Sequence, residues 1–539
     1  MKKHLLSLVS LVLAFALVLG GCAGLREDIM DGLGRLLYGD PVHFDEMEYT
    51  RPDADAFVSA VEQCVADAQD ADDAEELMDQ IYAVYEEYYD FYTNYSLANI
   101  YYCKDLTDSA WEEEYNYCID AATDVDAALD QLLYGLADCP LRDELESDDY
   151  FGQGFFDDYE GESLWDETFT DLMAQESDLI ARYYALSAQG AELDPYSEEY
   201  FTACGYEMEE LFVKLVALRQ EIAAYAGYDS YQQFAYDMYY YRDYTPEQAL
   251  ILTDSVQKEL VPVYENLSYD VWEVAYAECD EEDMLEYAES AATAMGGTVA
   301  DAYAMMTENG LYDITYSENK YNASFETYLY SYYSPYVFVN PTGYGLDKLT
   351  LVHEFGHFCN DYASGGGIVS VDVAEIFSQA MEYLSLFYGD ASKKLERYKL
   401  ADSLCVFVEQ SAYASFENKV YDLRGDQLTV ENVRELFSAE CTAFGFGAWG
   451  VDGRDYVRIT HFFTNPLYII SYVVSNDAAM QIYQAEQAEE GRGLALYTEN
   501  LDSMESWFLT FLEQAGLESP FEEGHTASLR ETFEAILGG

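Results

Sequence analysis

Two histidines four residues apart, with a glutamate directly after the first, are the part of this sequence best suited to chemistry. The segment reads His353-Glu-Phe-Gly-His357. On a helix, residues i and i+4 lie on one face, so both imidazoles can bind one metal ion. Glu354 lies about 100° around the helix from His353, close enough to act on a water without binding the metal. The pattern predicts a catalytic Zn²⁺ site with an open coordination position.

The sequence contains only six histidines, so this spacing is uncommon by chance. A pair of ordinary histidines on a helix surface is the alternative interpretation. Cys359 falls on the opposite side of the same helix and is predicted to lie in the core. His43 and His525 have no partner that the sequence suggests, and both are predicted to be surface residues.

The elements just before this motif must position it. Residues 324–333 and 336–340 are rich in Tyr, Phe and Val, and Pro335 separates them, which predicts two strands. An edge strand beside the metal could bind an extended peptide through backbone hydrogen bonds. A turn over 341–345 follows, and Asp347 is predicted to open the helix that carries the histidines.

Elsewhere the pattern is helical. Residues 54–189 place apolar and tyrosine side chains three and four apart, with breaks near Cys139-Pro140 and over 152–161. Thr245-Pro246 and Gln248 predict a capping box that begins another helix. We therefore expect a mainly α-helical fold with one small β-sheet beside the metal helix.

Charge limits the classes of partner. The 539-residue chain carries 104 Asp and Glu against 25 Lys and Arg, a formal net charge of −79. Such a field repels nucleic acid and favours solubility and cationic partners. A preference for basic peptides is compatible with it, and so is an acidic coat suited to the habitat. Hydrophobic residues make up 50% of the sequence, which excludes global disorder.

The N-terminus has the features of an export signal. Lys2 and Lys3 precede an apolar run over residues 5–19, and Gly20-Gly21-Cys22 follows. The cysteine after small residues resembles a bacterial lipobox, which implies cleavage before Cys22 and a lipid on its sulfur. An uncleaved signal anchor is the alternative. We expect a signal peptide over 1–21, a tether over 22–45, and an extracytoplasmic protein that is lipid-anchored to the bacterial cell membrane.

The other nine cysteines are scattered without a C-x-x-C pair, which argues against both a disulfide framework and a zinc ribbon. Export permits disulfides, and Cys103 could pair with Cys118, but the sequence does not decide this.

A second motif follows the histidines. After Gly365-Gly366-Gly367 comes Asp372-Val-Ala-Glu375-Ile-Phe-Ser378-Gln379. H-E-F-G-H followed by D-x-x-E-x-x-S-Q resembles the thimet oligopeptidase and oligoendopeptidase F family of zinc metallopeptidases. The resemblance implies that Glu375 is the third metal ligand. Two histidines and a carboxylate form a known catalytic zinc set.

The sequence leaves alternative roles for two nearby acidic residues, Asp372 and Glu382. Glu382 would be the alternative ligand if the register of this motif were wrong. Asp372 could hold the second nitrogen of a ligand histidine, or it could be a solvated or capping residue.

The resemblance extends over about residues 206–516. It includes Arg458-Ile-Thr-His461 and the segment Pro466-Leu-Tyr468-Ile-Ile-Ser-Tyr472, which is similar to the family's segment facing the zinc from the opposite wall. This implies that His461 and one or both tyrosines stabilise the oxyanion of the tetrahedral intermediate. Tyr468 and Tyr472 are four residues apart and share a helix face, so either could make the contact.

The resemblance further implies two lobes around a deep substrate channel, for which we expect an N-terminal helical lobe over 46–205 and a catalytic lobe over 206–539. The implied function is that of a zinc-dependent metalloendopeptidase with one Zn²⁺ per chain, acting on short peptides with Glu354 as general base. The alternatives are a non-catalytic peptide-binding lipoprotein and an exopeptidase, either a dipeptidase or a carboxypeptidase. We expect a monomer.

Overall fold

The structure is a computed structural model of the whole chain. It describes residues 41–147, 150–159, 164, 166–367, 369–446 and 450–538. The predicted signal peptide, the predicted lipidation site Cys22 and most of the predicted tether lie outside the described residues.

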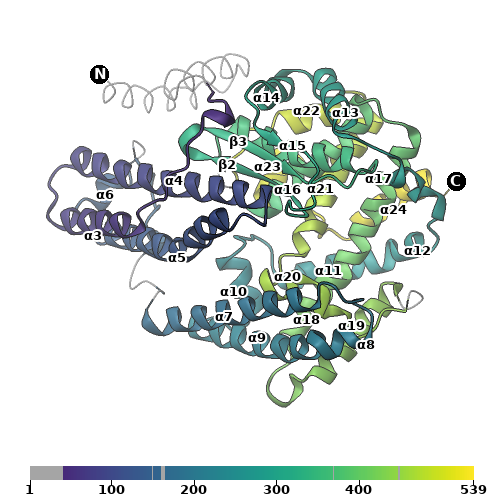
Figure 1. Cartoon of the computed structure of the whole chain (residues 1–539), viewed down its shortest axis with the longest axis horizontal. Coiled ribbons are helices and arrows are strands. Elements are labelled where there is room, and N and C mark those ends of the chain that lie inside the picture. The colour runs from purple at the N-terminus through teal and green to yellow at the C-terminus, as the bar shows by residue number, and fades with distance from the viewer. Residues whose placement is uncertain are drawn as a thin grey trace.

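Helices dominate the fold, and one small sheet lies among them (Figure 1). The prediction of a mainly α-helical architecture with a small sheet beside the metal helix is confirmed. Within the described part of the chain, no helix is both long enough and apolar enough to cross a membrane.

An N-terminal arm projects from the rest of the molecule (Figure 1, left). It consists of α3 (Ala54–Asp70), α4 (Ala74–Lys104), α5 (Ser109–Ala137) and the short α6 (Arg142–Leu145). Asp53, Asp73 and Asp108 cap the three long helices, because each carboxylate accepts backbone N–H groups of the first turn. The arm buries its own apolar cluster, in which Ile81 and Leu132 are fully buried.

Helices of the main body precede the sheet in the sequence. They are α7 (Glu167–Gly190), α8 (Glu198–Tyr200), α9 (Tyr206–Tyr225), α10 (Tyr231–Met238), α11 (Pro246–Glu259), α12 (Val261–Tyr264), α13 (Glu281–Met295) and α14 (Gly297–Glu308). The predicted capping box at Thr245 is present, with reciprocal bonds between Thr245 and Gln248.

The sheet of the described residues has the strand order β1-β3-β2, with β1 at Tyr312–Asp313, β2 at Ser324–Leu329 and β3 at Ser334–Val339. β3 is central and fully buried; it pairs parallel to β1 and antiparallel to β2. The prediction that Pro335 separates the two strands is wrong. Pro335 lies inside β3 opposite Tyr328, and the turn instead uses Tyr330–Tyr332 and the left-handed Tyr333.

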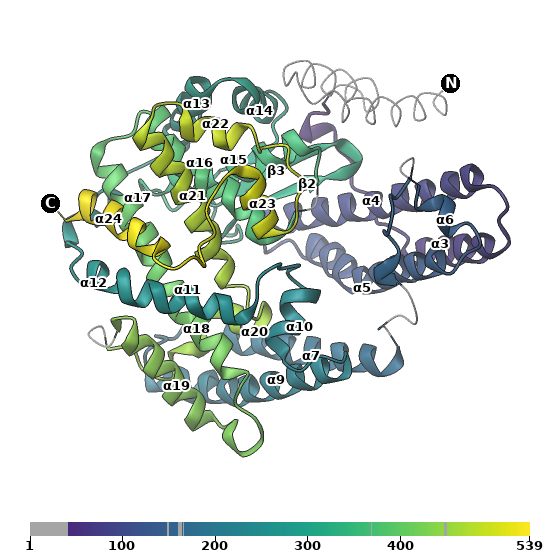
Figure 2. The same ribbon diagram turned by 180° about the vertical axis from the view of Figure 1, so that it is seen from behind.

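The remaining helices follow the sheet. They are α15 (Asp347–Ser364), α16 (Val371–Tyr388), α17 (Lys393–Cys405), α18 (Ser411–Val420), α19 (Val430–Ala443), α20 (Thr460–Thr464), α21 (Ile470–Ala488), α22 (Arg492–Thr498), α23 (Phe508–Ala515) and α24 (His525–Leu537). The helix predicted to begin at Asp347 does so. α16 packs between α15 and α21 at the centre of the body (Figure 2).

The hydrophobic core of the main body includes residues from both predicted lobes. Leu186 and Leu215 belong to it, and so does Phe44 at the end of the predicted tether. The predicted boundary at 205/206 falls in a continuous helical stretch, because a π-helical turn over Phe201–Gly205 leads directly into α9. The nine described cysteines are all free, Cys103 and Cys118 among them, and Cys359 is buried as predicted.

Candidate metal centre and active site

The helix that carries both histidines begins at a buried carboxylate. Asp347 is 1% exposed, and its oxygens accept three backbone N–H groups of the preceding turn, at residues 342–344. These bonds fix the entry of the chain into α15, and a negative charge at a helix N-terminus is favourable. One helical turn separates His353 from His357, whose ring centroids lie 5.2 Å apart.

Gly356, between the two histidines, allows α15 to approach α16 closely. A Cβ atom at this position would lie 2.5 Å from Cα of Ser378 and 2.7 Å from the carbonyl oxygen of Phe377. Those distances leave no room for a side chain, so packing requires glycine here. The close approach places Glu375 of α16 opposite the two histidines.

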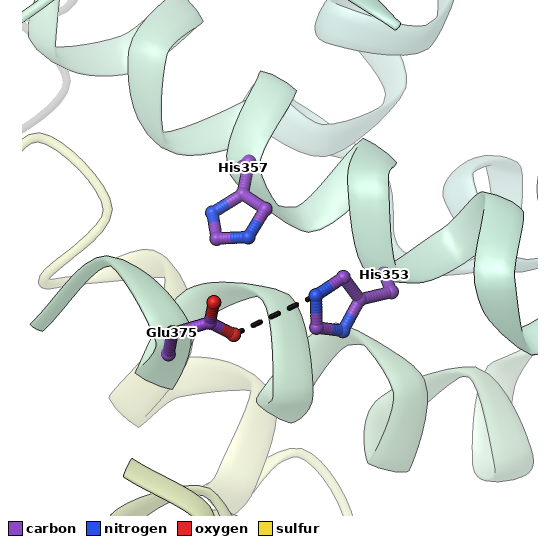
Figure 3. A group of neighbouring side chains, drawn as sticks. All are labelled: His353, His357 and Glu375. Atoms are coloured by element: carbon purple, nitrogen blue, oxygen red, sulfur yellow. Dashed lines mark ion pairs between the residues drawn. The ribbon is translucent and has the colours of Figure 1, made fainter. Parts of the chain in front are cut away.

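His353, His357 and Glu375 form a compact group (Figure 3). One ligand atom from each residue lies within 4.8 Å of the other two, and Nε2 of His353 is 3.6 Å from Oε2 of Glu375. Ser378 donates a hydrogen bond to the Glu375 carboxylate, which restrains its orientation. The geometry thus brings together the three side chains that the sequence predicted as metal ligands.

Glu382 is not a member of this group. It contacts the other ring nitrogen of His353, the one that does not face Glu375. Its Oε1 lies 2.9 Å from Nδ1 of His353, and its Oε2 lies 2.7 Å from Nζ of the buried Lys399. A carboxylate on one ring nitrogen fixes the tautomer and leaves the other nitrogen for a metal. The alternative prediction of Glu382 as a ligand is therefore replaced by this supporting role.

The protonation of the two histidines differs. Burial lowers the pKa of His357 to about 4, so its imidazole is neutral at pH 7, the form that binds metal. Burial acts in the same direction on His353, but the hydrogen bond to Glu382 and the charges of Glu375 and Glu382 outweigh it and raise its pKa to about 9. A metal at His353 would therefore displace a proton.

Glu354 faces a cavity of about 680 Å³ that also exposes both histidines and Glu375. The side chain is largely buried, at 5% exposure, and burial raises the pKa of its carboxyl. A desolvated carboxylate is a stronger base than a solvated one. Ser324 and Glu326 of β2 line the same cavity, so the edge strand borders the site as the sequence suggested.

Tyr468 and Tyr472 line this cavity across from the histidine helix. Their ring centroids are 5.2 Å apart. Burial is the largest effect on both hydroxyls and raises their pKa, to about 12 for Tyr472, so both remain protonated donors at neutral pH. A pair of phenolic donors beside a metal centre suits stabilisation of an oxyanion.

His461 lies next to the two tyrosines. Its Nε2 is 3.4 Å from the Tyr472 hydroxyl, and its ring centroid is 5.4 Å from that of Tyr468. Burial lowers the pKa of the imidazole, so it is neutral at pH 7. His461 is not among the residues that line the cavity, so its role as an oxyanion donor stays a prediction.

Asp372 does not contact a ligand histidine through any described hydrogen bond. Its Oδ2 accepts from Nε of Arg242 at 3.1 Å and from the Tyr244 hydroxyl at 2.8 Å. The side chain is fully buried, so a solvated role is also wrong. Its main partner is 130 positions away in the chain, which the local sequence could not indicate.

The donor set fits a zinc ion. Two imidazoles and one carboxylate converge from two helices, Glu382 fixes the tautomer of one imidazole, and the remaining side faces the cavity. Three protein donors and an open side are the arrangement of catalytic zinc sites.

Sequence reasoning considered Glu382 only as an alternative ligand, missed Lys399, and misplaced His525. The spacing of seven residues between Glu375 and Glu382 put both on one helix face and could have suggested the supporting role. Lys399 gave no signal, because it reaches Glu382 from α17. His525, predicted at the surface, is buried with Nε2 2.8 Å from Asp477, whereas His43 is exposed as predicted.

Residues 44–163 match the family model of the Peptidase M3 N-terminal domain. This segment comprises the arm and its immediate surroundings, but not the candidate metal centre. No curated protein sequence matches the chain.

Solved structures share the fold over nearly the whole chain. A candidate oligoendopeptidase F is 20% identical with a TM-score of 0.79, covering 92% of this chain and 99% of its own. PZ peptidase A, solved with an inhibitor, is 20% identical with a TM-score of 0.78 and the same coverage. A candidate oligoendopeptidase F from Bacillus anthracis is 20% identical with a TM-score of 0.74, covering 93% and 98%. The predicted fold class is thereby confirmed, because the chain shares the fold of solved oligoendopeptidase F structures.

Proposed function

We propose that this chain is a zinc-dependent metallopeptidase that cleaves internal bonds of short peptides. The observation that carries the proposal is the convergence of His353, His357 and Glu375 on one point, with Glu354 beside it in the same cavity. The match of the arm to a peptidase domain and the shared fold support the same class.

Zn²⁺ held by the three ligands would supply Lewis acidity to a water molecule and to the substrate carbonyl. Glu354 takes a proton from the attacking water and delivers it to the leaving amine. Tyr468 and Tyr472 donate hydrogen bonds to the oxygen on which negative charge develops, and His461 orients the Tyr472 hydroxyl. Glu382 holds the ring of His353 in place.

An extended peptide would reach this group along β2. Among the described residues, β2 pairs with β3 on one side only, and three residues of β2, 324–326, line the cavity. Backbone pairing with an edge strand places alternate side chains of a peptide in the cavity. Backbone recognition of this kind needs neither free terminus of the peptide, which favours internal cleavage over the exopeptidase alternative.

We also propose that the protein is exported and carries a lipid on Cys22. The support is the N-terminal sequence alone: a basic start, a short apolar run, and glycines before the cysteine. Mass spectrometry of the native protein tests this, because a mature chain beginning at Cys22 carries a diacylglyceryl mass, whereas Cys22→Ser retains residues 1–21. A native chain beginning at Met1 would refute the proposal.

The experiment that tests the function compares the chain from Ala23 onward with its Glu354→Gln variant and with Glu318→Gln, a matched change at an exposed glutamate. Zinc content and hydrolysis of an internally quenched, terminally blocked peptide pool are measured for each. We expect one zinc in all three and hydrolysis in the parent and Glu318→Gln only.

Other outcomes separate the alternatives. Zinc without any cleavage by the parent would favour the peptide-binding protein. Cleavage only of peptides with free termini would favour the exopeptidase. Absence of zinc from the parent would refute the metal centre.

A further inference from the structure

Leu467 adopts a backbone conformation that is unfavourable for its residue type. Its φ is +66°, and it lies between Pro466 and Tyr468, directly before the tyrosines of the site. A left-handed conformation is unfavourable for a residue with a Cβ, so the surroundings must impose it.

Both sides of Leu467 are held by buried groups from distant elements. Its N–H donates to Oε1 of Glu417 on α18 at 2.8 Å, and its carbonyl oxygen accepts from Nη1 of Arg242 at 2.9 Å. The Tyr240 hydroxyl donates to the carbonyl oxygen of Pro466 at 2.8 Å. The turn is therefore fixed from outside its own sequence.

The planar guanidinium of Arg242 makes two further contacts. Its Nε lies 3.1 Å from Oδ2 of Asp372, one helical turn before the metal ligand Glu375, and its Nη2 donates to Oγ of Ser471 at 2.8 Å. Ser471 directly precedes Tyr472. One guanidinium thus joins the ligand helix α16, the Leu467 turn and the first turn of α21.

The guanidinium has little freedom to move. Arg242 is 4% exposed and stacks between Tyr236 and Tyr240, whose ring centroids are 4.4 and 4.3 Å from Cζ. A lysine in this place would keep the charge but could not donate in three fixed directions. The contact geometry is therefore specific to arginine.

We infer that Arg242 is a positioning residue for the proposed reaction, holding the metal-ligand helix and the Tyr468–Tyr472 wall in register through Asp372, the Leu467 carbonyl and Ser471. The inference rests on the proposed function, because it makes Arg242 responsible for the distance between the metal ligands and the oxyanion donors. A displacement of about 1 Å in such a site can lower the rate about 100-fold.

The test uses Arg242→Lys in the full mature chain, with Arg434→Lys as the matched control. Arg434 also forms a two-pronged ion pair, with Glu209, but it lies outside the site. For Arg242→Lys we expect unchanged zinc content, a KM within about twofold, and a kcat about 10 to 100 times lower. Affinity for a tetrahedral phosphinic peptide should fall by the same factor as kcat/KM. Arg434→Lys should keep the parent's kcat.

A comparison in a second background separates positioning from a merely structural role. In the Tyr468→Phe/Tyr472→Phe enzyme, the donors that Arg242 positions are absent, so Arg242→Lys should have little further effect on kcat. Asp372→Asn, which keeps the shape of the partner, should show a smaller loss with the same pattern and serves if the lysine variant does not fold.

If Arg242→Lys lowers kcat by the same factor in the Tyr468→Phe/Tyr472→Phe background as in the parent, the inference is overturned. A change confined to KM or to zinc content would also overturn it. An inactive parent enzyme with bound zinc would instead refute the proposed function. The two failures are thus distinct.

Discussion

Nδ1 of His353 and Oε1 of Glu382 lie 2.9 Å apart, and the other oxygen of Glu382 lies 2.7 Å from Nζ of Lys399. All three side chains come from different helices of the main body, α15, α16 and α17. Glu382 is thus a charged acceptor for the imidazole of His353, and the buried Lys399 balances its negative charge.

Replacing Glu382 should weaken metal binding without removing a ligand. Glu382→Gln accepts the same hydrogen bond with a neutral oxygen, so we expect zinc affinity to fall about 10- to 100-fold. Competition with a chromogenic chelator measures this, with Glu318→Gln as control. An unchanged affinity would contradict the supporting role of Glu382.

Gly356→Ala should disturb the distance between the two ligand-bearing helices. The added methyl group would meet Ser378 and the Phe377 carbonyl at distances below 3.0 Å, so α15 and α16 must separate. We expect a loss of about 1–3 kcal/mol in the free energy of unfolding and weaker zinc binding. Urea denaturation with and without zinc tests both effects. Parent-like behaviour in both would show that the packing accommodates the methyl group.

Removing one phenolic hydroxyl should affect the chemical step. At least one of the two variants, Tyr468→Phe or Tyr472→Phe, should lose an oxyanion donor. In that variant we expect kcat to fall about 100- to 1,000-fold with KM little changed. Steady-state kinetics on one peptide compares the two variants directly. Near-parent kcat in both, and in the double variant, would exclude the tyrosines from this role.

Glu417→Gln should change how stability depends on pH. Burial raises the pKa of Glu417 from 4.5 to about 8, against the opposing effects of the Leu467 N–H, Arg219 and Arg242. Between these values the folded state holds a proton that the unfolded chain releases, so the parent loses stability as pH rises from about 4.5 to about 8. The variant does not titrate and should gain stability relative to the parent between pH 5 and pH 9, on the order of a few kcal/mol.

Thermal or urea unfolding of both proteins at several pH values measures this gain. A constant difference across the range would show that Glu417 has an ordinary pKa in the folded state.

His525→Gln should destabilise the protein most at low pH. Burial lowers the pKa of His525, but the hydrogen bond and charge of Asp477 outweigh it, with help from Glu518, and the net shift is upward. The stabilisation from the charged imidazole is therefore complete below the unfolded pKa and is lost as pH rises through the folded one. We expect the variant to be destabilised by about 3 kcal/mol at pH 6 and by less at pH 9. A larger deficit at pH 9 than at pH 6 would contradict this assignment.

The parts of the site that could be predicted from the sequence are those set by helical spacing. His353, Glu354 and His357 follow one another within a single turn, and Glu375 was found through a second short motif. The roles of Asp372 and Glu382 were not determined, because each depends on a partner from a distant part of the chain: Arg242, between α10 and α11, and Lys399 on α17. Burial of His525 was missed for the same reason, since its partner Asp477 lies 48 positions earlier.

The fold shows the same division between local and long-range information. The helices and the position of the sheet followed from local pattern, whereas Pro335 was read as a break and instead lies within β3. β1 has only two residues and pairs with β3 across 25 positions of sequence, so no local periodicity indicates it.

The arm of α3, α4 and α5 buries an apolar cluster separate from that of the main body. Two such clusters can act as distinct cooperative units, with different free energies of opening. Amide protons at the centre of the arm could then exchange with solvent through an opening that leaves α15 and α16 closed. Substitutions that loosen the arm would then change its exchange rates and its sensitivity to proteases while the proposed metal ligands keep their geometry.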